Sequence, residues 1–205
     1  MNLGLAELAA VAAALGWASG MRLYAVVFLT GAAGYLGWVA LPAGLQILQN
    51  PVVLGASFLL FAVEFVADKV PGVDTLWDAV HTFIRIPAGA ALAAGALGAD
   101  SAAWATIAAL AGGTLAATSH AAKTTTRAAA NTSPEPLSNI ALSLLGDAAV
   151  PAMLWLAWTH PLWFWPALAL AVIVGLVLIV VLFRFLRGLL RRLRQGVWLD
   201  RRAAS

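Results

Sequence analysis

The chain has 205 residues, of which 62% are hydrophobic and only 10% are charged, and its mean hydropathy is +0.91. This composition excludes an ordinary soluble domain, whose apolar share is nearer half. The absence of cysteine excludes disulfides, thiolate metal sites and a cysteine nucleophile. Several segments contain the roughly 20 apolar residues that a helix needs to cross a bilayer, and the short alternating strands of an outer-membrane barrel are not visible. The sequence therefore predicts an all-α, polytopic membrane protein with one transmembrane domain over residues 1–186.

The first expected membrane helix, at about 4–19, contains Glu7 and lacks the basic start of a signal peptide, so we interpret it as a retained helix. Further apolar segments follow at roughly 23–43, 51–68, 86–98, 102–119, 139–159 and 161–186. Two intervening stretches, 74–85 and 120–131, have the period of helices that are polar on one face. The first should continue into the next apolar segment through a kink at Pro87, and the second is either a half-helix or a short span. Together these segments predict about seven to eight membrane-embedded helices.

The two halves of the domain, about 4–98 and 102–186, show a similar order of features. In each half an apolar helix ends at a polar break with an arginine, and an asparagine then precedes a helix that carries an acid, Glu64 or Asp147. Broken helices in corresponding positions of two halves mark the binding site of many transporters. We therefore expect two related halves with broken or re-entrant helices.

The end of the chain, residues 187–205, is expected to be a basic tail. Seven of the twelve basic residues lie between positions 184 and 202. Arginine that is clustered just beyond a membrane helix marks the cytoplasmic side, and it can contact anionic lipid headgroups. Because the adjacent membrane surface accounts for this charge, we expect a cytoplasmic C-terminus and no nucleic-acid partner.

An acidic stripe lies in the stretch "EFVADKVPGVDTLWDAVHTFIR", residues 64–85. Its members recur every three or four residues before and after a Pro-Gly break, so they share a helix face on each side of it. An amphipathic helix on the membrane surface would usually be rich in lysine or arginine on its polar face, and the mixed charge instead favours the lining of a polar cavity. The members of the acidic stripe are Glu64, Asp68, Asp74, Asp78, His81 and Arg85.

A basic stripe follows on the next polar helix. It comprises His120, Lys123, Arg127 and Asn131, which also cover one helix face. These residues could be flanking charges at a membrane boundary. Alternatively, they form a cationic wall that holds an anionic substrate or pairs with the acidic stripe. Since the acidic stripe has an excess of acids and the basic stripe has none, we expect the two to face each other.

Asp147 stands in an otherwise apolar span and shares a helix face with Asn139 and Ser143. Ionisable residues inside a membrane usually serve a pathway or pair with one another. Asp147 could therefore bind a proton reversibly, or it could form a structural pair with Arg22, Lys123 or Arg127. Arg22, in "SGMRLY", either reaches a lipid headgroup or is the counterpart of Arg127 in the other half.

The runs "ADKVPGVDTLWD" and "AAKTTTRAAANTSPEPLSN" resemble those of a bacterial membrane family known as domain of unknown function 4126. The matching positions are Ala67 to Asp74, His120, Lys123, Arg127, Asn131, Ser133 to Asn139 and Asp147. The resemblance implies a multi-pass protein of the bacterial inner membrane. It implies no activity, because the family has none assigned.

The favoured hypothesis is a small membrane transporter or channel in which the stripes meet near the bilayer centre. Carboxylates would carry protons or cations, and Arg22, Lys123 and Arg127 would hold an anionic solute. A lipid or lipid-carrier flippase or scramblase is the first alternative. A membrane-embedded enzyme acting on lipid headgroups and a non-catalytic scaffold are further alternatives, and an enzymatic role is the less favoured one.

Few other ligands or partners are indicated by the sequence. The three dispersed histidines lack the spacing of metal ligands, and no cofactor-binding motif is present, so we expect neither a metal nor a cofactor. The partners that we expect are the lipid bilayer and a small ion or solute. Small-residue faces, such as the one with Gly89, Ala93 and Gly112, suit close helix packing within one chain or in a homodimer.

Overall fold

The computed structural model describes residues 4–70, 72–98, 101–132 and 136–203, with side chains as far as Arg191 apart from that of Pro136. All regular structure in these ranges is helical. In chain order the elements are α1 (Leu5–Tyr35), the 3-10 helix η1 (Ala43–Gln49), α2 (Pro51–Ala67), α3 (Val73–Leu97), α4 (Ala102–Ala130), α5 (Pro136–Thr159) and α6 (Pro161–Ala203). The predicted all-α class is confirmed.

Most of these helices are long and apolar enough to cross a membrane. Five single helices of the described part of the chain meet this condition, and η1 with α2 forms a sixth candidate that is bent by 72°. This result agrees approximately with the predicted seven to eight embedded helices, because some predicted segments join. The stretch 74–85 and the apolar segment after it form the single helix α3, which continues through Pro87. Likewise, 120–131 is the end of the continuous helix α4, so it is neither a half-helix nor a separate span.

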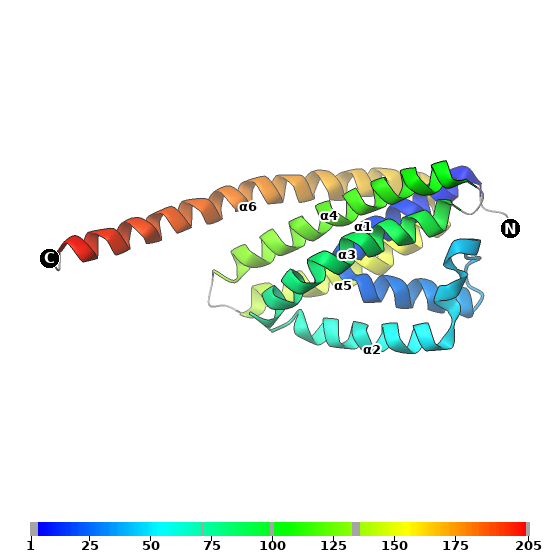
Figure 1. The fold of residues 1–205 in the computed structure, drawn as a ribbon, viewed down its shortest axis with the longest axis horizontal. Helices are drawn as coiled ribbons and strands as arrows, with labels where there is room; N and C mark the ends of the chain where they lie inside the picture. Colours follow the sequence, from blue (N-terminus) through cyan, green and yellow to red (C-terminus); the bar gives the residue numbers. More distant parts are fainter. Residues whose placement is uncertain (1–3, 71, 99–100, 133–135, 204–205) are drawn as a thin grey trace.

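Helix α1 is broken at Arg22, whose backbone angles of φ −151° and ψ 86° are not helical. Figure 1 shows α1 running away from the N-terminus and then returning towards the same end of the molecule. On the first arm, the backbone at Gly16 lies close to Gly112 of α4. On the second arm, Phe28 packs against Phe58 of α2, with ring centroids 5.2 Å apart. The helix is therefore a re-entrant hairpin with Arg22 at its tip, although its length alone would allow it to cross.

The α1 hairpin lies in the middle of the protein. Its first arm is almost wholly buried, and α3 and α4 pack against it through small residues. Helices α2 to α6 then run alternately between the two ends of the molecule, and α6 continues well beyond the others to the C-terminus (Figure 1). Most large side chains of α6 are exposed and apolar, which suits contact with lipid. The division into two related halves stays a prediction.

If α1 is a re-entrant hairpin, its two ends lie on the same side of the membrane. Because the protein has no cysteine, single cysteines can be introduced at the exposed positions Leu5, Leu36 and Leu190. We expect a membrane-impermeant maleimide to label Leu5→Cys and Leu36→Cys from the same side of oriented vesicles, and Leu190→Cys from the opposite side. If Leu5→Cys and Leu36→Cys react from opposite sides, α1 crosses the membrane and the hairpin is wrong.

The close approach of α1 and α4 predicts opposite effects for two glycine substitutions. A Cβ atom at Gly16 would lie 2.6 Å from the Cα atom of Gly112, whereas one at Gly55 of α2 would meet nothing within 4 Å. We expect Gly16→Ala to lower the free energy of unfolding by about 1–3 kcal/mol through overpacking. Gly55→Ala should be neutral or raise it by up to about 1 kcal/mol, because alanine favours the helix. Thermal unfolding in detergent measures both, and equal effects would contradict this packing.

Candidate functional site

The break at Arg22 leaves backbone carbonyl groups of the first arm without helical partners, and α4 supplies replacements. Lys123 Nζ donates to the carbonyl oxygen of Met21 at 3.1 Å. Ser119 Oγ donates to the carbonyl oxygen of Trp17 at 2.7 Å. Unsatisfied backbone groups inside a membrane cost several kcal/mol each, so such donors are needed wherever a helix breaks there. The basic stripe therefore holds the hairpin tip as well as carrying charge.

Asp68, at the C-terminal end of α2, is the centre of a buried ion-pair network. Its carboxylate lies 2.8 Å from Arg22 Nη1, 3.0 Å from Lys123 Nζ and 2.8 Å from Arg127 Nη1. The side chain of Asp68 is fully buried. Three cations around one carboxylate leave an excess of positive charge, so this cluster requires further acids close by.

The acidic stripe of α3 supplies the nearest of these acids. Asp78 lies 2.8 Å from Arg85 and 3.0 Å from Lys123, and its other oxygen lies 3.6 Å from Arg127. Arg85 in turn pairs with Glu64 of α2 at 2.5 Å. The prediction that the acidic and basic stripes face each other is thus confirmed. They meet in direct contact, whereas the mixed charge of the acidic stripe predicted the lining of a polar cavity.

Asp74, in the first turn of α3, closes one end of the network. Its carboxylate accepts hydrogen bonds from the side-chain amides of Asn131 at 3.3 Å and Asn139 at 3.1 Å. It also lies 3.8 Å from Arg127 and accepts from the backbone N–H of Thr75 at 2.6 Å. Asp74 therefore joins the ends of α3, α4 and α5.

Asp147 of α5 closes the other end of the network. Its two oxygens lie 2.7 Å from Arg22 Nε and 3.2 Å from Lys69 Nζ. Arg22 also donates to Ser143 Oγ at 2.9 Å. Of the three partners that the sequence allowed for Asp147, the structure therefore contains Arg22. Lys123 and Arg127 pair with the acids of α2 and α3 instead.

The two histidines of the stripes lie at the edge of the network. His81 is 3.1 Å from the hydroxyl of Tyr24 and stacks on Trp77, with ring centroids 4.1 Å apart. His120 is 2.7 Å from the hydroxyl of Thr82. Among the residues that the structure describes, no group of three or more acidic or histidine side chains has the arrangement of a metal site.

The network contains five carboxylates and five cations, so its formal charge is zero with both histidines neutral. The acids are Glu64, Asp68, Asp74, Asp78 and Asp147, and the bases are Arg22, Lys69, Arg85, Lys123 and Arg127. The side chains of Lys69 and Asp147 are 23% and 16% exposed, and the other eight are at most 6% exposed. The Lys69–Asp147 pair is therefore the accessible edge of the network.

All thirteen residues proposed from the sequence thus lie in or beside the network, but three further members were missed. Lys69 is next to Asp68 in the sequence and could have formed a local pair with it, but it reaches across to Asp147 instead. All five basic residues that precede Arg184, Lys69 included, belong to the network. Tyr24 and Thr82 carry no sequence signal.

The central position of Asp68 predicts a strong and partly reversible destabilisation. We expect Asp68→Asn to lower the free energy of unfolding by about 3–5 kcal/mol, because three buried cations lose a common partner. Adding Lys123→Met should restore at least about 1 kcal/mol, since it removes one of the stranded charges. Chemical unfolding in detergent measures this cycle, with Glu7→Gln outside the network as the control. Strictly additive losses would show that the two residues do not interact.

Comparison with known proteins identifies the family but no activity. No curated protein and no solved structure matches the chain. Residues 9–184 match the family described as a domain of unknown function (DUF4126). This match covers the α1 hairpin apart from its first four residues, every residue of the network and the apolar part of α6. The chain belongs to the DUF4126 family, as its "ADKVPG" and "SPEP" runs suggested.

Proposed function

We propose that the protein is a small membrane transporter in which protonation of a carboxylate is coupled to the entry of an anionic solute at the tip of the α1 hairpin. The observation that carries this proposal is the position of Arg22. This residue interrupts a helix inside the membrane domain and pairs at once with Asp68 and Asp147. Discontinuous helices of this kind form the substrate and ion sites of many transporters.

The charge balance of the network supports coupling between a proton and an anion. Protonation of one carboxylate would leave a single uncompensated positive charge among nearly inaccessible groups. An isolated charge in such a place is costly unless a partner compensates it. An anion that enters together with the proton restores neutrality, whereas either one alone does not.

Asp147 is the favoured proton acceptor. It is the most accessible of the five carboxylates, and it is held by Arg22 at the hairpin tip and by Lys69 beyond the end of α2. Loss of its negative charge would weaken the contact between Arg22 and α5 to the hydrogen bonds with Ser143, while the ion pair between Arg22 and Asp68 remains. The hairpin tip could then move relative to α5, which is the motion that alternating access requires.

The arginine-rich end of α6 supports an orientation for the proposed transporter. In Figure 1 this end lies on the side of the molecule opposite to the N-terminus. Clustered arginine favours the cytoplasmic side. We therefore place the C-terminus in the cytoplasm and the protein in the bacterial inner membrane.

Proton movement in liposomes tests the proposal. Purified protein would be reconstituted with an internal pH-sensitive dye, and inward gradients of chloride, phosphate or succinate would be applied in turn. We expect at least one of these anions to drive acidification several-fold above that of empty liposomes. Asp147→Asn should reduce the signal to the background, because residue 147 can then no longer exchange a proton. Glu7→Gln, outside the network, should leave the signal unchanged.

Four results would count against this mechanism. Acidification that persists in the double variant Asp147→Asn/Glu64→Gln would exclude these carboxylates as carriers. Movement of labelled lipid between leaflets without any gradient would favour the flippase or scramblase alternative, and a chemically changed headgroup would favour an enzyme. A protein that shows none of these activities, and keeps its stability after paired removal of charges, would be a scaffold.

A further inference from the structure

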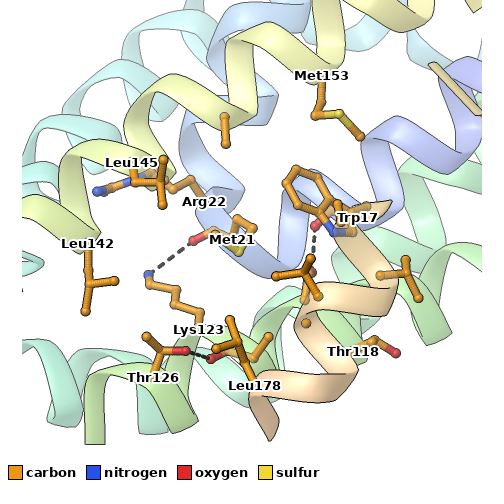
Figure 2. A pocket seen from close by; sticks show the side chains of 18 of the residues that line it. Trp17, Met21, Arg22, Thr118, Lys123, Thr126, Leu142, Leu145, Met153 and Leu178 are labelled. Carbon is orange, nitrogen blue, oxygen red and sulfur yellow. Dashed lines mark hydrogen bonds between the residues drawn. The ribbon is translucent and has the colours of Figure 1, made fainter. Parts of the chain in front are cut away.

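A cavity of about 420 Å³ lies beside the ion-pair network, between α1, α4, α5 and α6. Figure 2 shows side chains from all four helices pointing into it. Its volume is within the range of about 300–1,000 Å³ that is typical of small-molecule sites. None of the contacts described for the network fills this space, so it needs a separate explanation.

The cavity is longer than a compact solute requires. Its lining on α5 extends from Leu142 to Met153, which corresponds to roughly 16 Å along a helix axis. Side chains of α6 from Ala171 to Leu178 line it over roughly 10 Å of that length. The space is therefore a slot that runs along the helices, and its walls are almost entirely apolar.

The two ends of the slot differ in chemistry. Trp17 and Met153 line one end, and no charged side chain lies beside them there (Figure 2). Three cations of the network, Arg22, Lys123 and Arg127, line the other end. The carboxylates that pair with these cations lie behind them and do not line the slot. The side chains of these three cations are at most 6% exposed, so an anionic head in the slot would reach them by replacing part of their contacts with the carboxylates.

We infer that this slot binds a single-chain anionic amphiphile, with the hydrocarbon chain along α5 and α6 and a carboxylate or phosphate head at the three cations. Water alone is a poor occupant, because an apolar wall offers it few hydrogen-bond partners. A compact polar anion would leave most of the slot empty. A chain with an anionic head satisfies both the apolar length and the cationic end.

A hydroxyl group near the cationic end supports this assignment. Ser143 lines the slot close to Arg22, from which its oxygen accepts a hydrogen bond, so its own hydrogen can be donated to an anionic head. The occupant does not depend on the proposed transport, since binding requires neither a gradient nor movement of the hairpin. The two inferences can therefore fail separately.

Photo-crosslinking tests the occupant. The full chain would be placed in phosphatidylcholine nanodiscs with a 16-carbon fatty acid that carries a diazirine in its chain, and the labelled residues would be mapped by mass spectrometry. We expect labels between Leu142 and Met153 and between Ala171 and Leu178. Unlabelled palmitate should compete at least about 10-fold better than hexadecanol, because one charge-assisted contact accounts for that ratio.

A lysophosphatidate competitor separates the two head chemistries. If it competes better than palmitate, the head is a phosphate, and if it competes less well, the head is a carboxylate. Either order supports the site as long as both anionic competitors exceed the neutral alcohol. Equal competition by the alcohol would overturn the cationic end of the site, and labels confined to residues outside the slot would overturn the site itself.

A matched pair of substitutions controls for folding and for general contact with lipid. Ala149 lines the slot, whereas the neighbouring Ala148 is exposed and does not. We expect Ala149→Phe to reduce labelling of the slot about 10-fold, because the larger ring occupies the space of the chain. Ala148→Phe should leave this labelling unchanged. If Ala149→Phe proves unstable, Ala149→Leu with the same readout replaces it, and undiminished labelling in a folded slot-filling variant would contradict the proposal.

Discussion

The pairing of Arg22 with both Asp68 and Asp147 is the contact on which the arrangement of the membrane domain depends. A helix that reverses inside a membrane exposes backbone groups and places its tip among apolar neighbours, and both are unfavourable. Here the tip carries a guanidinium that bridges α2 and α5, while Lys123 of α4 satisfies a carbonyl group that the break has freed. The same contacts therefore stabilise the reversal of α1 and bring the charges together.

Burying so many charges costs much free energy in a chain of this size. Replacing a buried ion pair by apolar residues of similar volume is often neutral or stabilising, so ten charges, eight of them buried, are not needed merely to hold helices together. The small residues between α1, α3 and α4 already provide close packing without charge. The charges add directionality, since each ion pair forms only in certain geometries. They also add sensitivity to protonation, because the loss of one negative charge changes the charge balance of the whole network. Both properties suit a protein that changes conformation better than they suit a helix bundle with a purely structural role.

The periodicity of the polar residues predicted most of the site, and it failed where partners come from distant segments. Offsets of three and four placed the acidic and basic stripes on helix faces, and the excess of acid in one and of base in the other predicted that they meet. The break at Arg22 was predicted, but the reversal of α1 there could not be found in the same way, because both arms are largely apolar and show no polar face that would set their direction. The sequence also could not predict that Asp147 pairs with Arg22 and not with Lys123, since this depends on how closely the hairpin tip approaches α5.

The two faces of the network suggest why the slot and the accessible acid occur together. The slot is lined by Arg22, Lys123 and Arg127. The most exposed pair of the network, Asp147 and Lys69, does not line the slot. Arg22 belongs to both faces, because it lines the slot and binds Asp147. An anionic head near Arg22 would compete with Asp147 for the same guanidinium and would weaken the hold of α5 on the hairpin. A proton on Asp147 would weaken it from the other side. Occupation of the slot and protonation of Asp147 should therefore favour each other, which is the reciprocity expected of two ligands that act on one bistable element.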